Sequence, residues 1–279
     1  MRLPLNGSEP QDVPRALAVR MLRHAIDRGV TYIDTAYPYH GGASEAVVAE
    51  ALRDCYRPRV MVADKLPIWM VKAPADVGRL IDEQLRRLET DFIDVYLIHN
   101  LARSTWPIVE QHGVIEQLEK AKAAGKIGHL GFSFHDSFEL FQTIVDAYEG
   151  WSVAQIQYNY VNERVQAGTK GLRYAAEKGL AVVIMEPLLG GCLVKPPPGV
   201  AKVFAEAPCE RTPAEWALQW LWNKPEVAVV LSGMSTMEQV VDNLDSAARS
   251  GVGSLDEAEL ATIAAAAAAY KGAFPIPCT

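Results

Sequence analysis

The sequence lacks the features that mark membrane, secreted or nucleic-acid-binding proteins. No run of about 18 apolar residues occurs in its 279 residues, and the opening MRLPLNGSEPQDV has no apolar core of a signal peptide. Lys and Arg number 27 against 34 Asp and Glu, a net charge of −7 that disfavours binding to nucleic acid or anionic lipid. We therefore predict a cytoplasmic protein with a small-molecule partner and neither nucleic acid nor membrane, and its oligomeric state stays open.

Cysteine is scarce and scattered. The four cysteines, one of them Cys278 near the C-terminus, form no CxxC pair, so the sequence predicts neither a disulfide framework nor a zinc site. We expect buried or incidental thiols at Cys55, Cys192 and Cys209, and no metal in this chain.

What the chain does have is a regular alternation of short apolar runs and amphipathic stretches. Near-continuous runs of β-branched residues are typical of strands buried on both faces of a parallel sheet. The predicted strands are Thr31–Asp34, Val60–Lys65, Asp94–His99, His129–Ser133, Val153–Gln157, Ala181–Glu186 and Ala228–Leu231. Predicted helices between or before them include Ala16–Arg28, Ala75–Leu88 and Val114–Ala124. Capping boxes at Thr212–Glu215 and Ser254–Glu257 predict two further helix starts, and Lys195–Gly199 (KPPPG) is predicted to be a loop.

Polar side chains recur where the predicted strands end. Such ends meet at one mouth in a closed barrel, whereas an open dinucleotide-binding sheet would favour a GxGxxG after its first strand, and none is present. The strand-end residues are Asp34, Lys65, His99, Ser133, Gln155 and Glu186. We predict a single domain over residues 1–279 with the (β/α)8 architecture of a TIM barrel. Seven strands are found where eight are needed, and the polar segment before Val13 does not resemble a strand, so the first strand is expected to be absent.

Four residue types at this mouth suit the reduction of a carbonyl. A tyrosine, whose free pKa is about 10, can donate a proton to the carbonyl oxygen when an ammonium lowers that pKa. A carboxylate keeps the ammonium charged, and a histidine orients the carbonyl. Each residue alone has an ordinary structural role open to it, as a cap, strand terminus or satisfied polar group. Together, Asp34, Tyr39, Lys65 and His99 form a coherent device for acid catalysis.

Several segments in order resemble the aldo-keto reductase family. They are YIDTAYPYHGGASE (Tyr32–Glu45), VADK (Val62–Lys65), LRRLETDFIDVYLIHN (Leu85–Asn100), GKIGHLGFS (Gly125–Ser133), QIQYN (Gln155–Asn159), EPLLGG (Glu186–Gly191) and SGMSTMEQVVDNL (Ser232–Leu244). The resemblance implies an NAD(P)H-dependent oxidoreductase that reduces an aldehyde or ketone to an alcohol by hydride transfer. It also implies that Tyr39 is the general acid, that Lys65 and His99 assist it, and that Asp34 pairs with Lys65.

The resemblance further implies a cofactor site along the mouth. Ser133 and Gln155 match positions that bind the nicotinamide carboxamide, and Met185 stands where many members have an aromatic ring. The remaining positions are Leu188, Gly190 and Gly191 near the pyrophosphate, and Gly233, Met234, Gln239 and Asn243 near the adenine end. That last segment carries neither Lys nor Arg, so either a cation from elsewhere meets a 2′-phosphate or NADH is accepted. We expect NADP(H) more than NAD(H), as is usual in the family.

The substrate and the chain ends leave alternatives open. Tyr37, Trp69 and Trp106 lie on loops after predicted strands and would wall the carbonyl pocket or merely cover the rim. Both ends are expected to be truncated, and FPIPCT with Cys278 resembles the start of an iron–sulfur tail that is otherwise absent here. Two alternatives to a reductase are a cofactor-binding regulatory or structural subunit with little turnover, and a barrel enzyme with Lys65 as a Schiff-base nucleophile.

Overall fold

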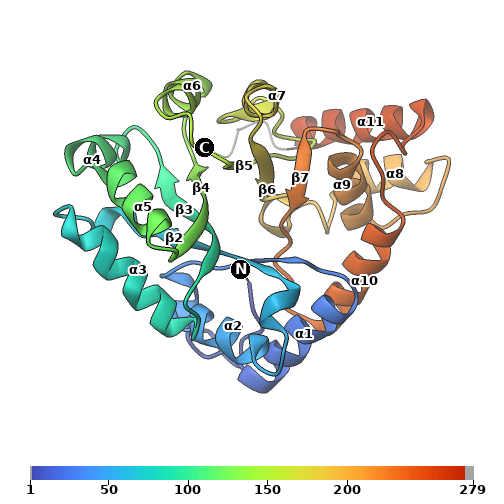
Figure 1. Ribbon diagram of the computed structural model, residues 1–279. Coiled ribbons are helices and arrows are strands. Elements are labelled where there is room, and N and C mark those ends of the chain that lie inside the picture. Colours follow the sequence, from blue (N-terminus) through green and yellow to red (C-terminus); the bar gives the residue numbers. More distant parts are fainter. Residues whose placement is uncertain (1, 274–279) are drawn as a thin grey trace.

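A computed structural model describes residues 2–273, in which seven parallel strands pair strictly in chain order. Their bounds are β1 (Tyr32–Asp34), β2 (Met61–Leu66), β3 (Ile93–Leu101), β4 (Ile127–Phe134), β5 (Val153–Gln157), β6 (Ala181–Met185) and β7 (Val227–Val230). The sheet curves into a barrel with the helices around its outside (Figure 1). The predicted barrel and its seven strands are confirmed, with strand ends displaced by at most two residues.

Eleven α-helices in the described part of the chain follow or flank the strands. They are α1 (Arg15–Asp27), α2 (Ser44–Leu52), α3 (Ala75–Arg87), α4 (Trp106–Gln111), α5 (Val114–Ala123), α6 (Phe138–Asp146), α7 (Gly168–Glu177), α8 (Pro198–Ala205), α9 (Pro213–Trp222), α10 (Met237–Ala248) and α11 (Glu257–Ala273). Of four short 3-10 helices in the described residues, η1 (Tyr39–Gly42) and η4 (Leu189–Gly191) lie in the loops after β1 and β6. No helix in residues 2–273 combines the length and apolar character that a membrane crossing requires.

The barrel has two apolar layers, one inside the ring of strands and one between the strands and the surrounding helices. The interior layer takes one side chain or more from every strand except β4: Tyr32, Ala63, Val95, Leu97, Val153, Val183, Val229 and Leu231. β4 contributes Gly131 there, where an added Cβ would lie 2.3 Å from the carbonyl oxygen of Val153 and 2.8 Å from Leu97. The larger layer fills the space between strands and helices, and it includes the fully buried Trp216.

The two outermost strands of the sheet, β1 and β7, are bridged by helices. Within residues 2–273 no strand pairing joins β1 to β7. Helices α1 and α10 pack together there through Met21, Ala25 and Val240. An ion pair of 2.8 Å between Arg28 and Asp245 closes the same contact at the surface. The helical coat thus continues where the sheet does not.

Two local predictions need correction. The α11 cap is Asp256, whose Oδ1 accepts the amide of Glu259 at 2.8 Å, so the helix begins at Glu257 and not directly after the predicted cap Ser254. The predicted Lys195–Gly199 loop ends early because Pro198 is the first residue of α8, a position that suits its fixed φ. Of the thiols predicted to be buried or incidental, Cys55 and Cys192 are exposed, and Cys209 is half-buried against the outer core. Cys278 lies outside the described residues.

Candidate active site

The alternation of side chains along each strand brings the predicted site together. Residues two positions apart point to the same face of a strand, so each residue two beyond the interior layer points into the mouth of the barrel. Starting from the interior residues Tyr32, Ala63, Leu97, Gly131, Val153, Val183 and Leu231, this rule selects Asp34, Lys65, His99, Ser133, Gln155, Met185 and Gly233. All seven belong to the predicted site.

A buried ion pair lies at the centre of the mouth. The Nζ of Lys65 donates to Asp34 Oδ1 at 2.7 Å and to the carbonyl oxygen of Thr35 at 2.7 Å. Burial tends to lower the pKa of the ammonium, yet the attraction of Asp34 and Tyr39 raises it above its ordinary value. Lys65 is therefore charged at neutral pH, and the Asp34 carboxylate compensates that charge inside the protein.

Tyr39 reaches this cation from the turn η1. The Lys65 Nζ lies 5.1 Å from the centroid of the Tyr39 ring. Burial raises the pKa of the Tyr39 phenol, while the charge of Lys65 pulls it back down. The turn that presents Tyr39 depends on backbone with positive φ at His40 and Gly41, 54° and 61°. The phenol is consequently protonated at neutral pH, with a cation beside it to stabilise its anion.

His99 completes the group from β3. Its ring centroid lies 5.8 Å from that of Tyr39 in an edge-to-face arrangement and 5.2 Å from that of Trp69. Burial and the nearby charge of Lys65 lower the pKa of His99 to about 3. Its Nδ1 is buried without a hydrogen-bond partner. The imidazole is therefore neutral and offers one nitrogen donor and one acceptor.

Ser133 and Gln155 are neighbours across β4 and β5, where they occupy the same register position. Ser133 Oγ accepts the amide of Asn100 at 2.7 Å, which leaves its hydroxyl proton free to be donated. Gln155 donates from Nε2 to Asp34 Oδ2 at 3.1 Å, and its Oε1 is buried without a partner. A donor beside an unsatisfied acceptor matches the two polar atoms of a carboxamide, so these residues fit a nicotinamide.

The loop after β6 offers exposed backbone to a cofactor. Met185 is half-buried at the strand end, and Leu188 packs at the edge of the outer core. Gly190 and Gly191 have φ values of 63° and 97°, and an added Cβ on Gly191 would meet nothing within 4 Å. Open space over a glycine turn permits close approach to a pyrophosphate.

The segment after β7 is held mostly by its own side chains. Gln239 Oε1 accepts the amide of Ser235 at 2.8 Å, and Asn243 donates to Ser232 Oγ at 3.0 Å. Met234 packs towards α1 and α10. Gly233 lies against the side chain of Arg2, whose Cγ would be 2.9 Å from an added Cβ. A cation from the start of the chain thus lies beside the predicted adenine end.

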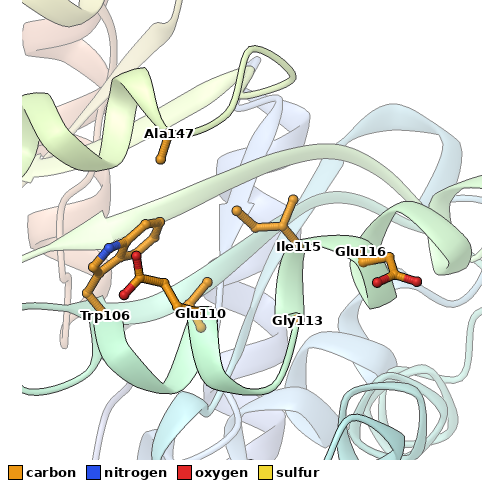
Figure 2. Close-up of a pocket in the computed structure, with 7 residues that line it drawn as sticks. Trp106, Glu110, Gly113, Ile115, Glu116 and Ala147 are labelled. Atoms are coloured by element: carbon orange, nitrogen blue, oxygen red, sulfur yellow. The ribbon is translucent and has the colours of Figure 1, made fainter.

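The three candidate pocket aromatics lie in different places. Trp69 is 39% exposed and contacts His99, so it belongs to the mouth. Tyr37 instead donates to Glu83, and the guanidinium carbon of Arg87 lies 4.1 Å from the centroid of the Tyr37 ring. Trp106 is buried and lines a groove of about 240 Å³ between α4, α5 and α6 (Figure 2), on the helical coat. The structure brings Trp69 alone of the three to the catalytic group.

Sequence reasoning missed the polar residues behind the mouth. Asp64 and Gln84 bond the backbone of Lys65 on both sides: Asp64 Oδ1 accepts its N–H at 2.8 Å, and Gln84 Nε2 donates to its carbonyl at 3.0 Å. Glu45 is fully buried nearby on α2. The sequence did indicate a buried Asp64, because Asp64 lies on the same face of its strand as the apolar Val62 and Leu66.

Fold and site define a class: parallel (β/α) barrels that gather a buried lysine–aspartate pair, a tyrosine and a histidine at the carboxyl ends of their strands. The model of the "Aldo/keto reductase family" matches residues 5–268, and the chain belongs to this family. The predicted membership and oxidoreductase class are confirmed.

Named relatives agree with this assignment. A 6-dehydroglucose reductase of Novosphingobium aromaticivorans is 28% identical over 88% of this chain and 83% of its own length. An NADH-specific methylglyoxal reductase of Escherichia coli is 25% identical over 84% of this chain and 83% of its own. A solved aldo/keto reductase of Klebsiella pneumoniae, in complex with NADP and acetate, has a TM-score of 0.75 at 27% identity, over 100% of this chain and 92% of that one.

Proposed function

We propose that this chain reduces an aldehyde or ketone to an alcohol with Tyr39 as the general acid, and that Asp34, Lys65 and His99 support that proton transfer. The observation that carries the proposal is the contact of the Tyr39 ring with a buried, paired ammonium, 5.1 Å from its centroid. Bound NAD(P)H supplies the hydride. The chain's own contribution is to hold the carbonyl and deliver a proton to its oxygen.

The proton comes from the Tyr39 hydroxyl. As negative charge develops on the carbonyl oxygen, the phenol donates and becomes a phenolate beside Lys65 Nζ. The ammonium stabilises that phenolate, and the Asp34 carboxylate 2.7 Å away keeps the ammonium in place. The ion pair is already formed before reaction, so little reorganisation is needed when the charge moves.

His99 orients the carbonyl. A neutral imidazole at the mouth donates a hydrogen bond to the carbonyl oxygen without competing as a proton source. Because burial lowers its pKa to about 3, His99 stays neutral over the range in which Tyr39 is protonated. Trp69, packed on His99, forms an apolar wall beside the same position and favours an apolar or aromatic carbonyl substituent.

The residues that would hold the cofactor come from the ends of β4, β5 and β6, the loops after β6 and β7, and α10. Ser133 and Gln155 would bind the carboxamide, Met185 would pack on the nicotinamide, and Leu188, Gly190 and Gly191 would line the pyrophosphate. Gly233, Met234, Gln239 and Asn243 would lie near the adenine end. We propose a preference for NADPH, with Arg2 as the cation that meets the 2′-phosphate. Its position against Gly233 supports this, since phosphate recognition favours a guanidinium.

The test is oxidation of NADPH and of NADH, followed with the purified chain against a panel of aldehydes and ketones, with Tyr39→Phe as control. Turnover with at least one carbonyl, about 10²- to 10⁴-fold slower in Tyr39→Phe, is expected. Turnover at the wild-type rate in Tyr39→Phe would refute the assigned acid. Cofactor binding without turnover on any member of the panel would favour the regulatory or structural alternative, which no observation in the structure supports.

A further inference from the structure

Two carboxyl groups meet behind Lys65, on the side of β2 away from the mouth. The Asp64 side chain points out of the barrel, as do those of Val62 and Leu66, which belong to the apolar layer between strands and helices. Glu45 enters the same layer from α2. Both side chains are 0% exposed. Asp64 Oδ2 and Glu45 Oε1 have no donor from another residue, and the two carboxyl groups lie within hydrogen-bond reach of each other.

The charges around this pair do not balance if both carboxyl groups are ionised. Arg87 donates to Glu45 Oε2 at 3.0 Å, and the same guanidinium also serves Glu83. The ammonium of Lys65 points the other way, to Asp34. The titratable and charged groups that face the pair are Lys65 of β2, Arg87 of α3, Tyr96 of β3 and Tyr39 of η1. Glu83 and Tyr37 contact Arg87. A second buried negative charge without its own cation would be costly.

We propose that Asp64 is a protonated carboxylic acid that donates to Glu45 Oε1, and that this shared proton ties the turn carrying Tyr39 to the strand carrying Lys65. Arg87 forms an ion pair with Glu45 and none with Asp64, so Glu45 is the ionised member of the pair and Asp64 carries the proton. Burial and the charge of Glu45 raise the pKa of Asp64 well above its ordinary value, which agrees with a proton on Asp64.

The pair positions the catalytic group because each member is attached to one half of it. Glu45 lies at the start of α2, directly after η1 with Tyr39. Asp64 is bonded through Oδ1 to the N–H of Lys65. The bond between the two carboxyl groups therefore fixes the distance between Tyr39 and Lys65 from behind. This role rests on the proposed function; the shared proton itself does not.

The test compares Asp64→Asn and Asp64→Ala with the wild type. The asparagine amide still donates to Glu45 and its oxygen still accepts from Lys65, but it has no titrating proton. Infrared spectroscopy at neutral pH is expected to show a protonated carboxylic acid, sensitive to deuteration, that Asp64→Asn removes. Glu83 contacts the same arginine, so Glu83→Gln is the control, and it is expected to keep the band. A wild type without the band, or a band that survives in Asp64→Asn, would overturn the shared proton.

Stability against pH gives a second readout that needs no activity. The folded pKa of Asp64 lies above the ordinary value of 3.8, so the unfolded chain releases a proton that the folded chain retains. Wild-type stability should therefore fall, relative to Asp64→Asn, as pH rises from about 4 towards neutrality. A constant difference between the two proteins across that interval would contradict the proposal.

Activity then tests positioning. Asp64→Ala should lower kcat about ten- to a hundredfold with a smaller change in KM, because it loosens the geometry of the catalytic group. Asp64→Asn should restore most of kcat. An Asp64→Ala enzyme with wild-type kcat would overturn the positioning role. A wild type without turnover on any carbonyl would instead refute the proposed function, and the infrared band would still decide the shared proton.

Discussion

The Nζ of Lys65 lies 2.7 Å from Oδ1 of Asp34, with side-chain exposures of 1% and 8%. A pair this deeply buried stabilises the fold only while both partners are present, since either one alone is an uncompensated charge. The same pair provides the cation beside Tyr39. Stability and catalysis therefore depend on the same contact, and they can be separated by mutation.

Lys65→Met is expected to lower the free energy of unfolding by about 3–5 kcal/mol, because it leaves Asp34 buried and unpaired. The double variant Lys65→Met/Asp34→Asn should recover most of that loss while remaining inactive. Urea denaturation of the wild type, both single variants and the double variant measures the coupling. Additive effects of the two substitutions would show that the pair does not act as a unit.

His99 should make the protein sensitive to acid. Its folded pKa of about 3 lies below its ordinary 6.5, so the unfolded chain takes up a proton that the folded chain does not. Stability is thus complete above about pH 6.5 and is lost as pH falls towards 3. His99→Gln, which cannot titrate, should show a flatter profile in thermal unfolding across this window. Parallel profiles would mean that His99 is protonated in the folded protein.

The interior of the barrel has no room at Gly131. Gly131→Ala is expected to destabilise the protein by about 1–3 kcal/mol, because its methyl group would press on the Val153 carbonyl and on Leu97. Gly78 on the exposed face of α3 is the matched control, with nothing within 4 Å of an added Cβ. Gly78→Ala should instead stabilise by about 0.5–1 kcal/mol. Equal effects in denaturant titrations would contradict the tight interior.

Arg2 should discriminate between cofactors. Loss of a charged hydrogen-bond donor to the 2′-phosphate in Arg2→Ala is expected to raise KM for NADPH about tenfold while KM for NADH changes little. Arg2→Lys retains the charge and should show a smaller effect. Steady-state kinetics with both cofactors measures the ratio. An equal change in both KM values would exclude Arg2 as the phosphate partner.

Much of the site follows from sequence periodicity. A β-branched run that ends in a polar residue locates Asp34, Lys65 and His99 before any coordinates are known. The contact of Arg2 with Gly233 has no such signal, because it joins residues far apart in the chain.

Local patterns also fail where two of them overlap. Ser254–Glu257 and Asp256–Glu259 are both capping boxes, and the structure selects the second. Glu259 is additionally engaged by Arg211 and Cys209 on a distant loop, which local sequence cannot show. Asp64 was readable as a buried carboxyl, but its partner Glu45 was not, since the pairing depends on how α2 packs on β2.

The central claim is that Tyr39 delivers the proton, and the most direct test is the rate of carbonyl reduction in Tyr39→Phe. Tyr174→Phe is the control, because the Tyr174 hydroxyl bonds Asp146 on the outer helices. With NADPH and a carbonyl that the wild type reduces, kcat should fall by about 10²- to 10⁴-fold in Tyr39→Phe, with cofactor binding intact, and should be unchanged in Tyr174→Phe. A Tyr39→Phe enzyme that retains the wild-type kcat would contradict the account.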